Sequence, residues 1–203
     1  MSANQIPDSD LLKGTLQGDE QALTELYRRR QGAVYRFALQ MSGSIALAED
    51  VTQEVFMVLM REGISFDEAR GSLNAFLLGI ARNLVRQKCA REQFYVALDE
   101  NTEGDRPVAQ APGANDPFDN LIRNETVESV RRAVLSLPAR YREVVVLCDL
   151  QELSYAEVAS LLGCAVGTVR SRLHRARALL VEKLKPARED VAPAAMGSER
   201  CFA

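Results

Sequence analysis

The sequence has no tryptophan, a single histidine and four cysteines that lie far apart without a C-x-x-C pair. Such cysteine usage indicates neither a zinc site nor a disulfide framework. No apolar run approaches the roughly 20 residues that span a bilayer, and the first ten residues lack the basic-then-apolar order of a secretory signal. No glycine-rich phosphate loop and no motif uniting a nucleophile, a base and an orienting group are present. We therefore expect a cytoplasmic protein that is not an enzyme and holds no metal or cofactor.

Charge is unevenly distributed along a chain whose formal net charge is −3. The charges of residues 1–91 cancel, with 11 basic and 11 acidic side chains, whereas residues 92–117 carry six acids against one base. Residues 118–186 carry 11 bases against eight acids, and six of these bases lie between Arg170 and Lys185 beside a single acid. Between Ser72 and Arg91 there are four bases and no acid. Two basic stripes therefore flank an acidic connector, a distribution that favours nucleic-acid binding.

Hydrophobic periodicity predicts an all-α fold. Apolar residues recur at the i, i+3, i+4 and i+7 spacing of amphipathic helices, and no convincing alternation of period two appears. Turn signals at Gly18, Gly43 and Gly63 separate the helices of the first half. We expect these helices to form one domain, and they are predicted near residues 10–16, 22–37, 46–59 and 72–91.

The middle of the chain has the composition of a flexible linker, because glycine and proline punctuate a polar, acidic stretch with little to bury. Helix is expected to resume at Asp116–Pro117 and again after Pro138. The run Val144 to Leu147 would favour a strand in isolation, but the proline before it and the helical context favour helix. We thus predict two small helical domains, an acidic linker and a disordered tail, with boundaries at residues 1–91, 92–116, 117–186 and 187–203.

Residues 153–184 have the layout of a helix-turn-helix. Ser154 and Glu157 match a capping box at the start of the first helix, and Gly163 permits a tight turn after it. The second helix carries a narrow apolar stripe whose members fall within about 60° of one another at 100° per residue. The stripe consists of Val169, Leu173, Ala176 and Leu180.

The other face of the second helix is rich in arginine and suits phosphates or base edges in a major groove. The side chains that point away from the apolar stripe are those of Ser171, His174, Arg175 and Ala178. They are flanked by Arg170, Arg172 and Arg177. A merely solvated helix face is the alternative, but the capped helix and the glycine turn before it favour DNA. We expect His174 to contact DNA or solvent, since no nearby residue supplies the partners of a catalytic or metal-binding histidine.

Several strings, in their order and spacing, resemble the extracytoplasmic-function (ECF) sigma factors of bacterial RNA polymerase. VGTVRSRLHRAR at residues 166–177 resembles the family's promoter-reading helix. LSLP and LSYAEVA are also similar to the family's fourth region. GD-x-x-A, AEDV-x-QEVF and AFL-x-x-IARN resemble its second region, and the whole match covers about residues 10–91 and 117–185.

The resemblance implies that the C-terminal domain reads the minus-35 element and that the N-terminal domain melts the minus-ten element and captures an extruded base. The segment from Phe66 to Ser72 would line the pocket for that base. The expected minus-35 contacts are Thr168, Arg170, Ser171, Arg172, His174 and Arg175. The expected minus-ten contacts are Arg82, Asn83 and Arg86, with Lys88 and Arg91 suited to single-stranded backbone. The expected contacts with the polymerase's largest subunit are Asp50, Gln53 and Glu54.

The alternative for Asn83 is an ordinary surface asparagine of the helix. For the three polymerase-facing residues, spacing alone favours a solvated helix face. The resemblance implies core RNA polymerase, promoter DNA and an anti-sigma protein as partners of a promoter-specific initiation factor. The alternative is a stand-alone helix-turn-helix regulator, which would not need a melting domain over residues 48–91. Two positions depart from the family pattern: Ala165 is a poor helix cap, and Phe76 stands where tryptophan is often found.

Overall fold

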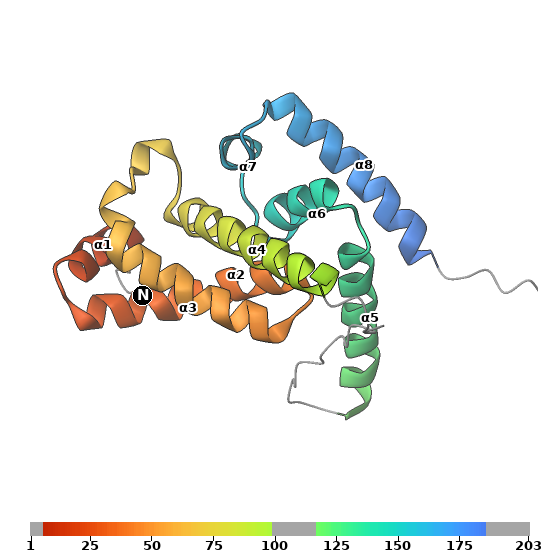
Figure 1. Ribbon diagram of the computed structural model, residues 1–203, viewed down its shortest axis with the longest axis horizontal. Coiled ribbons are helices and arrows are strands. Elements are labelled where there is room, and N and C mark those ends of the chain that lie inside the picture. Colours follow the sequence, from red (N-terminus) through yellow and green to blue (C-terminus); the bar gives the residue numbers. More distant parts are fainter. Residues whose placement is uncertain (1–5, 99–116, 186–203) are drawn as a thin grey trace, which may run out of the picture.

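The computed structural model describes residues 6–98 and 117–185, which form helices and connecting turns without a strand (Figure 1). The all-α prediction is therefore confirmed. Among the described residues, no helix is both long and apolar enough to cross a membrane. Part of the predicted linker and the tail after residue 185 lie outside the described residues. The first helices are α1 (Asp8–Leu16), α2 (Glu20–Ser42), α3 (Ile45–Glu62), η1 (Gly63–Ser65), η2 (Glu68–Arg70) and α4 (Leu73–Leu98).

Local capping sets the breaks between α1, α2 and α3. The Asp19 carboxylate accepts hydrogen bonds from the backbone N–H groups of Gln21 and Ala22 at 2.9 and 3.2 Å, which starts α2. Gly43 ends α2 in the left-handed conformation with φ of 73°, and the next residue, Ser44, caps α3. The turns expected at these places are present, so the three helices fold back on one another.

Helix α4 continues to Leu98, seven residues into the segment predicted to be linker. No glycine or proline occurs between residues 92 and 103, so no local signal ends the helix at Arg91. The helix packs on α2 and α3 and, across the molecule, on α7. Helix α4 therefore lies at the centre of the molecule, between the N-terminal helices and α7 (Figure 1).

The second group of helices follows the predicted order but contains one irregular turn. The chain is helical through the valine run, as predicted, because Val144, Val146 and Leu147 are fully buried and tertiary packing overrides their β propensity. The helix widens there into a π turn, in which the N–H of Gln151 donates to the carbonyl of Val146 at 2.9 Å. The elements are α5 (Pro117–Leu135), α6 (Ala139–Val145), η3 (Val146–Leu150), α7 (Tyr155–Leu162) and α8 (Val166–Leu184).

The two groups of helices pack against each other, which the sequence did not predict. Their buried side chains belong to one continuous apolar cluster that runs from Leu11 to Ala176. The Arg142 guanidinium on α6 crosses to α2 and donates to the carbonyl oxygen of Met41 at 2.8 Å. At the same junction, the side chain of Leu135 lies against Gly43, where an added Cβ would meet it at 3.3 Å. The C-terminal helices are therefore docked on the N-terminal ones in the structure.

Candidate nucleic-acid interface

The helix-turn-helix is built as the sequence predicts. The Ser154 hydroxyl accepts a hydrogen bond from the Glu157 N–H at 3.2 Å, and the Glu157 carboxylate accepts one from the Ser154 N–H at 3.0 Å. This capping box starts α7. Gly163 ends α7 with φ of 64°, and Ala165 precedes α8 without a side-chain cap. The tight turn sets α8 across α7 with its polar face outward.

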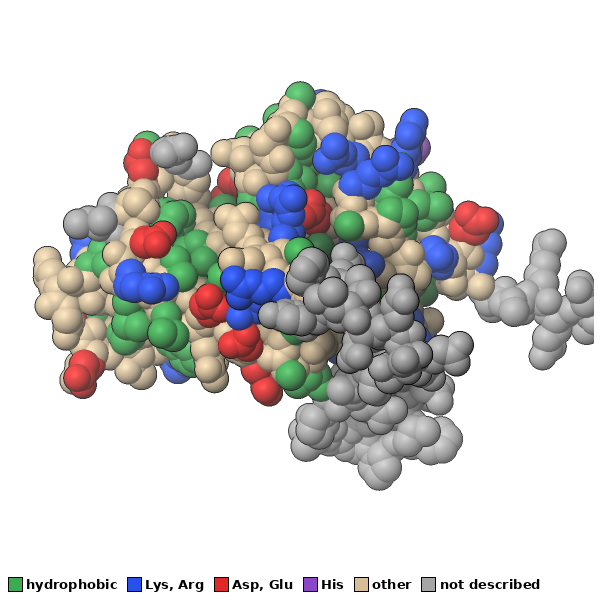
Figure 2. All heavy atoms as spheres, viewed as in Figure 1, with side chains coloured by type: hydrophobic (Ala, Val, Ile, Leu, Met, Phe, Trp, Pro, Cys, Tyr) green, Lys and Arg blue, Asp and Glu red, His purple; other side chains and the backbone are tan. Residues whose placement is uncertain are grey.

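Helix α8 buries its apolar stripe and exposes its arginine face. Val169, Leu173 and Ala176 are buried, and Leu180 is half-buried against the core. Lys and Arg side chains gather along α8 in Figure 2. Of the predicted minus-35 residues, the exposed ones are Arg170, Ser171, His174 and Arg175, and the half-buried ones are Thr168 and Arg172.

The arginines of α8 differ in how much of their charge is neutralised. Arg177 forms an ion pair with Asp149 at 2.6 Å. Arg170 lies 5.9 Å from the ring centre of Tyr155, and a hydrogen bond from Arg175 lowers the pKa of Tyr141 from its ordinary value. Among the described residues, no ion pair joins an acid to any of the predicted minus-35 arginines. The uncompensated positive charge of α8 is therefore concentrated in its first half.

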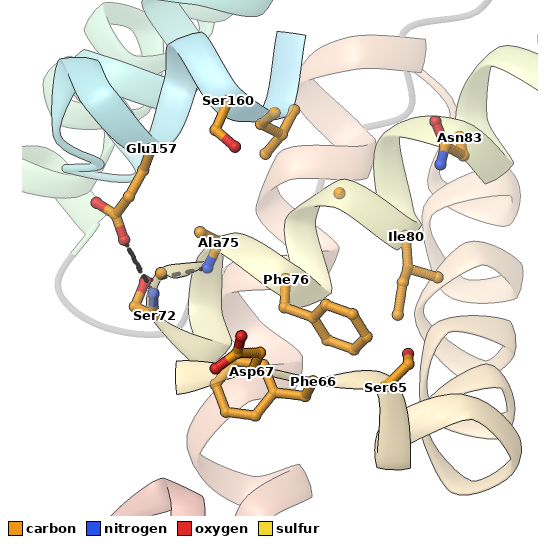
Figure 3. A pocket seen from close by; sticks show the side chains of 13 residues that line it. Ser65, Phe66, Asp67, Ser72, Ala75, Phe76, Ile80, Asn83, Glu157 and Ser160 are labelled. Atoms are coloured by element: carbon orange, nitrogen blue, oxygen red, sulfur yellow. Dashed lines mark hydrogen bonds between the residues drawn. The ribbon is translucent and has the colours of Figure 1, made fainter. Parts of the chain in front are cut away.

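A second candidate site is a cavity of about 480 Å³ between α4, the 65–72 segment and α7. The rings of Phe66 and Phe76 lie 5.5 Å apart and tilted by 58°, and they form an apolar wall. Figure 3 shows Phe76 and Ile80 pointing into the cavity from α4, with Asn83 farther along the same helix. An aromatic wall with an amide at its rim has the chemistry to stack and hydrogen-bond a nucleobase. The structure thus brings Asn83 to the segment that the sequence analysis expected to line a base pocket.

The three predicted minus-ten residues have different surroundings. Asn83 and Arg86 are exposed and line a neighbouring hollow on α4. Arg82 is only 15% exposed, because its guanidinium donates to the Glu143 carboxylate at 3.0 Å. In this arrangement Arg82 is engaged by the C-terminal group of helices. Glu143 was not predicted from the sequence, because it lies 61 residues from Arg82 and no local signal links the two.

The predicted polymerase-facing residues lie on one face of α3, and Gln53 is exposed there. Asp50 and Glu54 both form ion pairs with Lys88, which was expected to contact single-stranded DNA. The Lys88 ammonium lies 2.6 Å from the Asp50 carboxylate and 2.7 Å from that of Glu54. Hydrogen bonds to Asp50 and then Glu54 raise the pKa of Lys88. Lys88 was expected to face single-stranded DNA, but it joins α4 to the acidic face of α3.

Among the described residues, no group of three or more His, Cys, Asp or Glu side chains is placed to hold a metal ion. The chemistry of the surfaces described above is that of charge, hydrogen bonding and stacking. Such groups suit the binding of nucleic acid and protein.

Comparisons with known proteins show the family to which the chain belongs. The family model "Sigma-70 region 2" matches residues 26–95, and "Sigma-70, region 4" matches residues 128–180. The ECF RNA polymerase sigma factor SigW of Bacillus subtilis is 31% identical over 179 residues, covering 86% of this chain and 95% of that protein. SigE of Mycolicibacterium smegmatis is 34% identical over 171 residues, covering 82% of this chain and 64% of that protein.

A solved structure supports the same family. The sigma factor RpoE, in complex with the anti-sigma factor NepR from Bartonella quintana, matches with a TM-score of 0.68 and 28% identity. The match covers 81% of this chain and 98% of that one.

Proposed function

This chain belongs to the extracytoplasmic-function family of RNA polymerase sigma factors, and on that premise we propose how its surfaces share promoter recognition. As a sigma factor, it binds core RNA polymerase and directs initiation at specific promoters. Residues 1–91 form the unit that binds polymerase and melts the minus-ten element. Residues 117–186 form the unit that reads the minus-35 element, and residues 92–116 connect the two.

The observation that carries the minus-35 assignment is the geometry of α7 and α8. A capped helix and a left-handed glycine turn present a second helix whose apolar stripe is buried and whose arginines face outward. Arg170, Arg172 and Arg175 contact base edges or phosphates, and Thr168, Ser171 and His174 add polar contacts at the same surface. A stand-alone regulator would account for this half only. The match of residues 26–95 to region 2 favours a sigma factor instead.

The cavity beside α4 supports base capture at the minus-ten element. Asn83 reads the edge of an extruded base, the ring of Phe76 contacts its face, and Arg82 and Arg86 hold the strand's phosphates. The α4 side of the cavity offers the rings of Phe66 and Phe76 to the face of a base, with Asn83 at the rim. This assignment requires Arg82 to leave Glu143 when DNA is bound.

The face of α3 that carries Asp50, Gln53 and Glu54 docks on core polymerase. The two carboxylates are 60% and 36% exposed although Lys88 bridges them, so they remain accessible to a basic partner. Lys88 fixes α3 against α4 and so couples the docking face to the minus-ten helix. The relative of known structure was solved with an anti-sigma factor, which supports control of this chain by such a partner. We place the protein in the cytoplasm and assign it no catalytic reaction of its own.

The test is run-off transcription from a genomic DNA library with core RNA polymerase, with and without the purified protein. New, discrete start sites that share two spaced upstream elements are expected. If the protein binds DNA specifically but core polymerase gains no new starts, the chain acts as an ordinary helix-turn-helix regulator.

A matched pair of variants tests the reading helix. Arg175→Ala is expected to lower initiation at those sites by roughly 5- to 150-fold, since a good base contact is worth about 1–3 kcal/mol. Lys183→Ala removes an equal charge from the exposed last turn of the same helix and is expected to have little effect. Equal activity of the two variants would remove Arg175 from the minus-35 contacts.

A further inference from the structure

Two carboxylates of the C-terminal helices lie directly on the minus-ten helix α4. Glu157 accepts hydrogen bonds from the Ser72 hydroxyl at 2.6 Å and from the Ser72 N–H at 3.3 Å. Glu143 accepts from the Arg82 guanidinium at 3.0 and 3.4 Å. Neither carboxylate is needed there to complete the minus-ten helix, because Ser72 itself caps the helix by accepting from the N–H of Ala75 at 3.2 Å.

These two contacts bracket the candidate base pocket. Ser72 and Arg82 are ten residues apart, which is about 15 Å along an α-helix, and the cavity opens between them beside Asn83. Ser160 and Leu161 of α7 line the same cavity from the opposite side. In Figure 3, α7 lies above the cavity and Glu157 reaches down from it to Ser72. The C-terminal helices therefore cover the pocket as well as its flanks.

The chemistry of the contacts is that of nucleic-acid backbone. An anionic oxygen on an arginine and an anionic oxygen at a helix N-terminus are the interactions that a DNA phosphate makes. Burial opposes ionisation of Glu157, but hydrogen bonds from Ser72 and Ser154 outweigh it and bring its pKa to about 2. Glu157 is therefore an anion at neutral pH. A phosphate and either carboxylate cannot occupy the same donors at once.

We propose that the C-terminal domain acts as an intramolecular competitor of the promoter's single strand, with Glu143 and Glu157 standing in for two backbone phosphates on α4. This inference rests on the proposed function, because it takes α4 as the minus-ten surface. The docked form cannot capture a base, and the domains must separate before the minus-ten element binds. The docked arrangement is thus an autoinhibited state built into the chain itself.

The competition is tested with the full chain and a fluorescein-labelled single-stranded DNA 12-mer of random sequence, whose binding is followed by anisotropy. Glu143→Gln combined with Glu157→Gln removes both charges, while glutamine at position 157 can still complete the capping box. We expect this double variant to bind the probe about tenfold more tightly than the wild type does, since two charge-assisted contacts no longer compete. The control is Glu152→Gln with Glu182→Gln, which makes the same charge change at exposed positions of the same domain. Equal affinity of the two double variants overturns the proposal.

A second pair of variants tests the docked contact without altering the C-terminal domain. Ser72→Asp and Ser72→Asn both keep a capping side chain at the start of α4, but only aspartate places a like charge against Glu157. Small-angle X-ray scattering should give a larger radius of gyration for Ser72→Asp than for Ser72→Asn. Identical scattering overturns the proposal, whatever the run-off experiment shows. An absence of new start sites would instead refute the sigma-factor assignment, so the two failures are distinguishable.

Discussion

The Glu157 carboxylate should make the stability of the fold depend on pH in a defined window. Its pKa is lowered from 4.5 to about 2, so the stabilisation it provides is fully present above about pH 4.5 and is lost as pH falls toward 2. A shift of this size corresponds to about 3 kcal/mol of preference for the charged form. Because the group is partly exposed, solvent screening reduces its contribution to roughly 1–2 kcal/mol.

Glu157→Gln removes the charge while keeping a side chain that can complete the capping box. At pH 7 the variant should unfold at a lower urea concentration, with a free energy of unfolding roughly 1–2 kcal/mol below that of the wild type. The difference should shrink steadily below about pH 4.5, because the carboxylate of the unfolded wild type then takes up a proton while that of the folded protein stays charged down to about pH 2. Urea titrations followed by far-ultraviolet circular dichroism, from pH 7 down to about pH 3, measure this directly.

Glu182→Gln, at an exposed position on α8, is the control and should match the wild type throughout. A Glu157→Gln variant as stable as wild type at pH 7 would show that the hydrogen bonds to Ser72 and Ser154 do not favour the charged form. A destabilisation of constant size at every pH would assign the effect to side-chain shape instead of charge. Either result would refute the reasoning.

Three further perturbations have defined outcomes. Asn83→Ala should leave polymerase affinity unchanged but impair promoter opening, and normal permanganate reactivity of the minus-ten thymines would contradict its assignment. Lys88→Met removes the cation that pairs with Asp50 and Glu54, so affinity for core polymerase should rise about threefold at low salt and return to the wild-type value at high salt. Binding titrations at two ionic strengths check this. Gly163→Ala should cost about 1 kcal/mol and lower the Tm by roughly 2–4 °C, because φ of 64° is unfavourable for alanine although no atom lies within 4 Å of the new Cβ. An unchanged melting curve would show that the turn relaxes.

Features set by neighbouring residues were predicted from the sequence. The capping box of Ser154 and Glu157, the glycine turn at Gly163 and the buried stripe through Leu173 each depend on residues within one or two helical turns. Asn83 and parts of the 66–72 segment line one cavity, as the family resemblance implied, because the segment leads directly into α4. Periodicity and capping rules act over these distances, so features of this kind can be predicted from the sequence.

Contacts between distant parts of the chain were not predictable in this way. Arg82 and Glu143 are 61 residues apart, Ser72 and Glu157 are 85 apart, and nothing near any of them in sequence indicates its partner. The ion pairs of Lys88 were not predicted for the same reason, since only tertiary packing brings α4 alongside the acids of α3. The π turn after α6 likewise depends on burial of the valine run, which local propensity cannot report.

The order of the helices along the chain has a consequence for synthesis. A ribosome makes the chain from the N-terminus at roughly 5–20 residues per second, so α4 is complete several seconds before α8. During that interval the nascent N-terminal helices have no C-terminal helices to cover them, and their side of the shared apolar cluster faces water. Ser72 and Arg82 then have neither of their carboxylate partners. Each new molecule therefore passes once through a form in which Ser72 and Arg82 are uncovered, and the contacts form only after α6 and α7, which carry Glu143 and Glu157, have been synthesised.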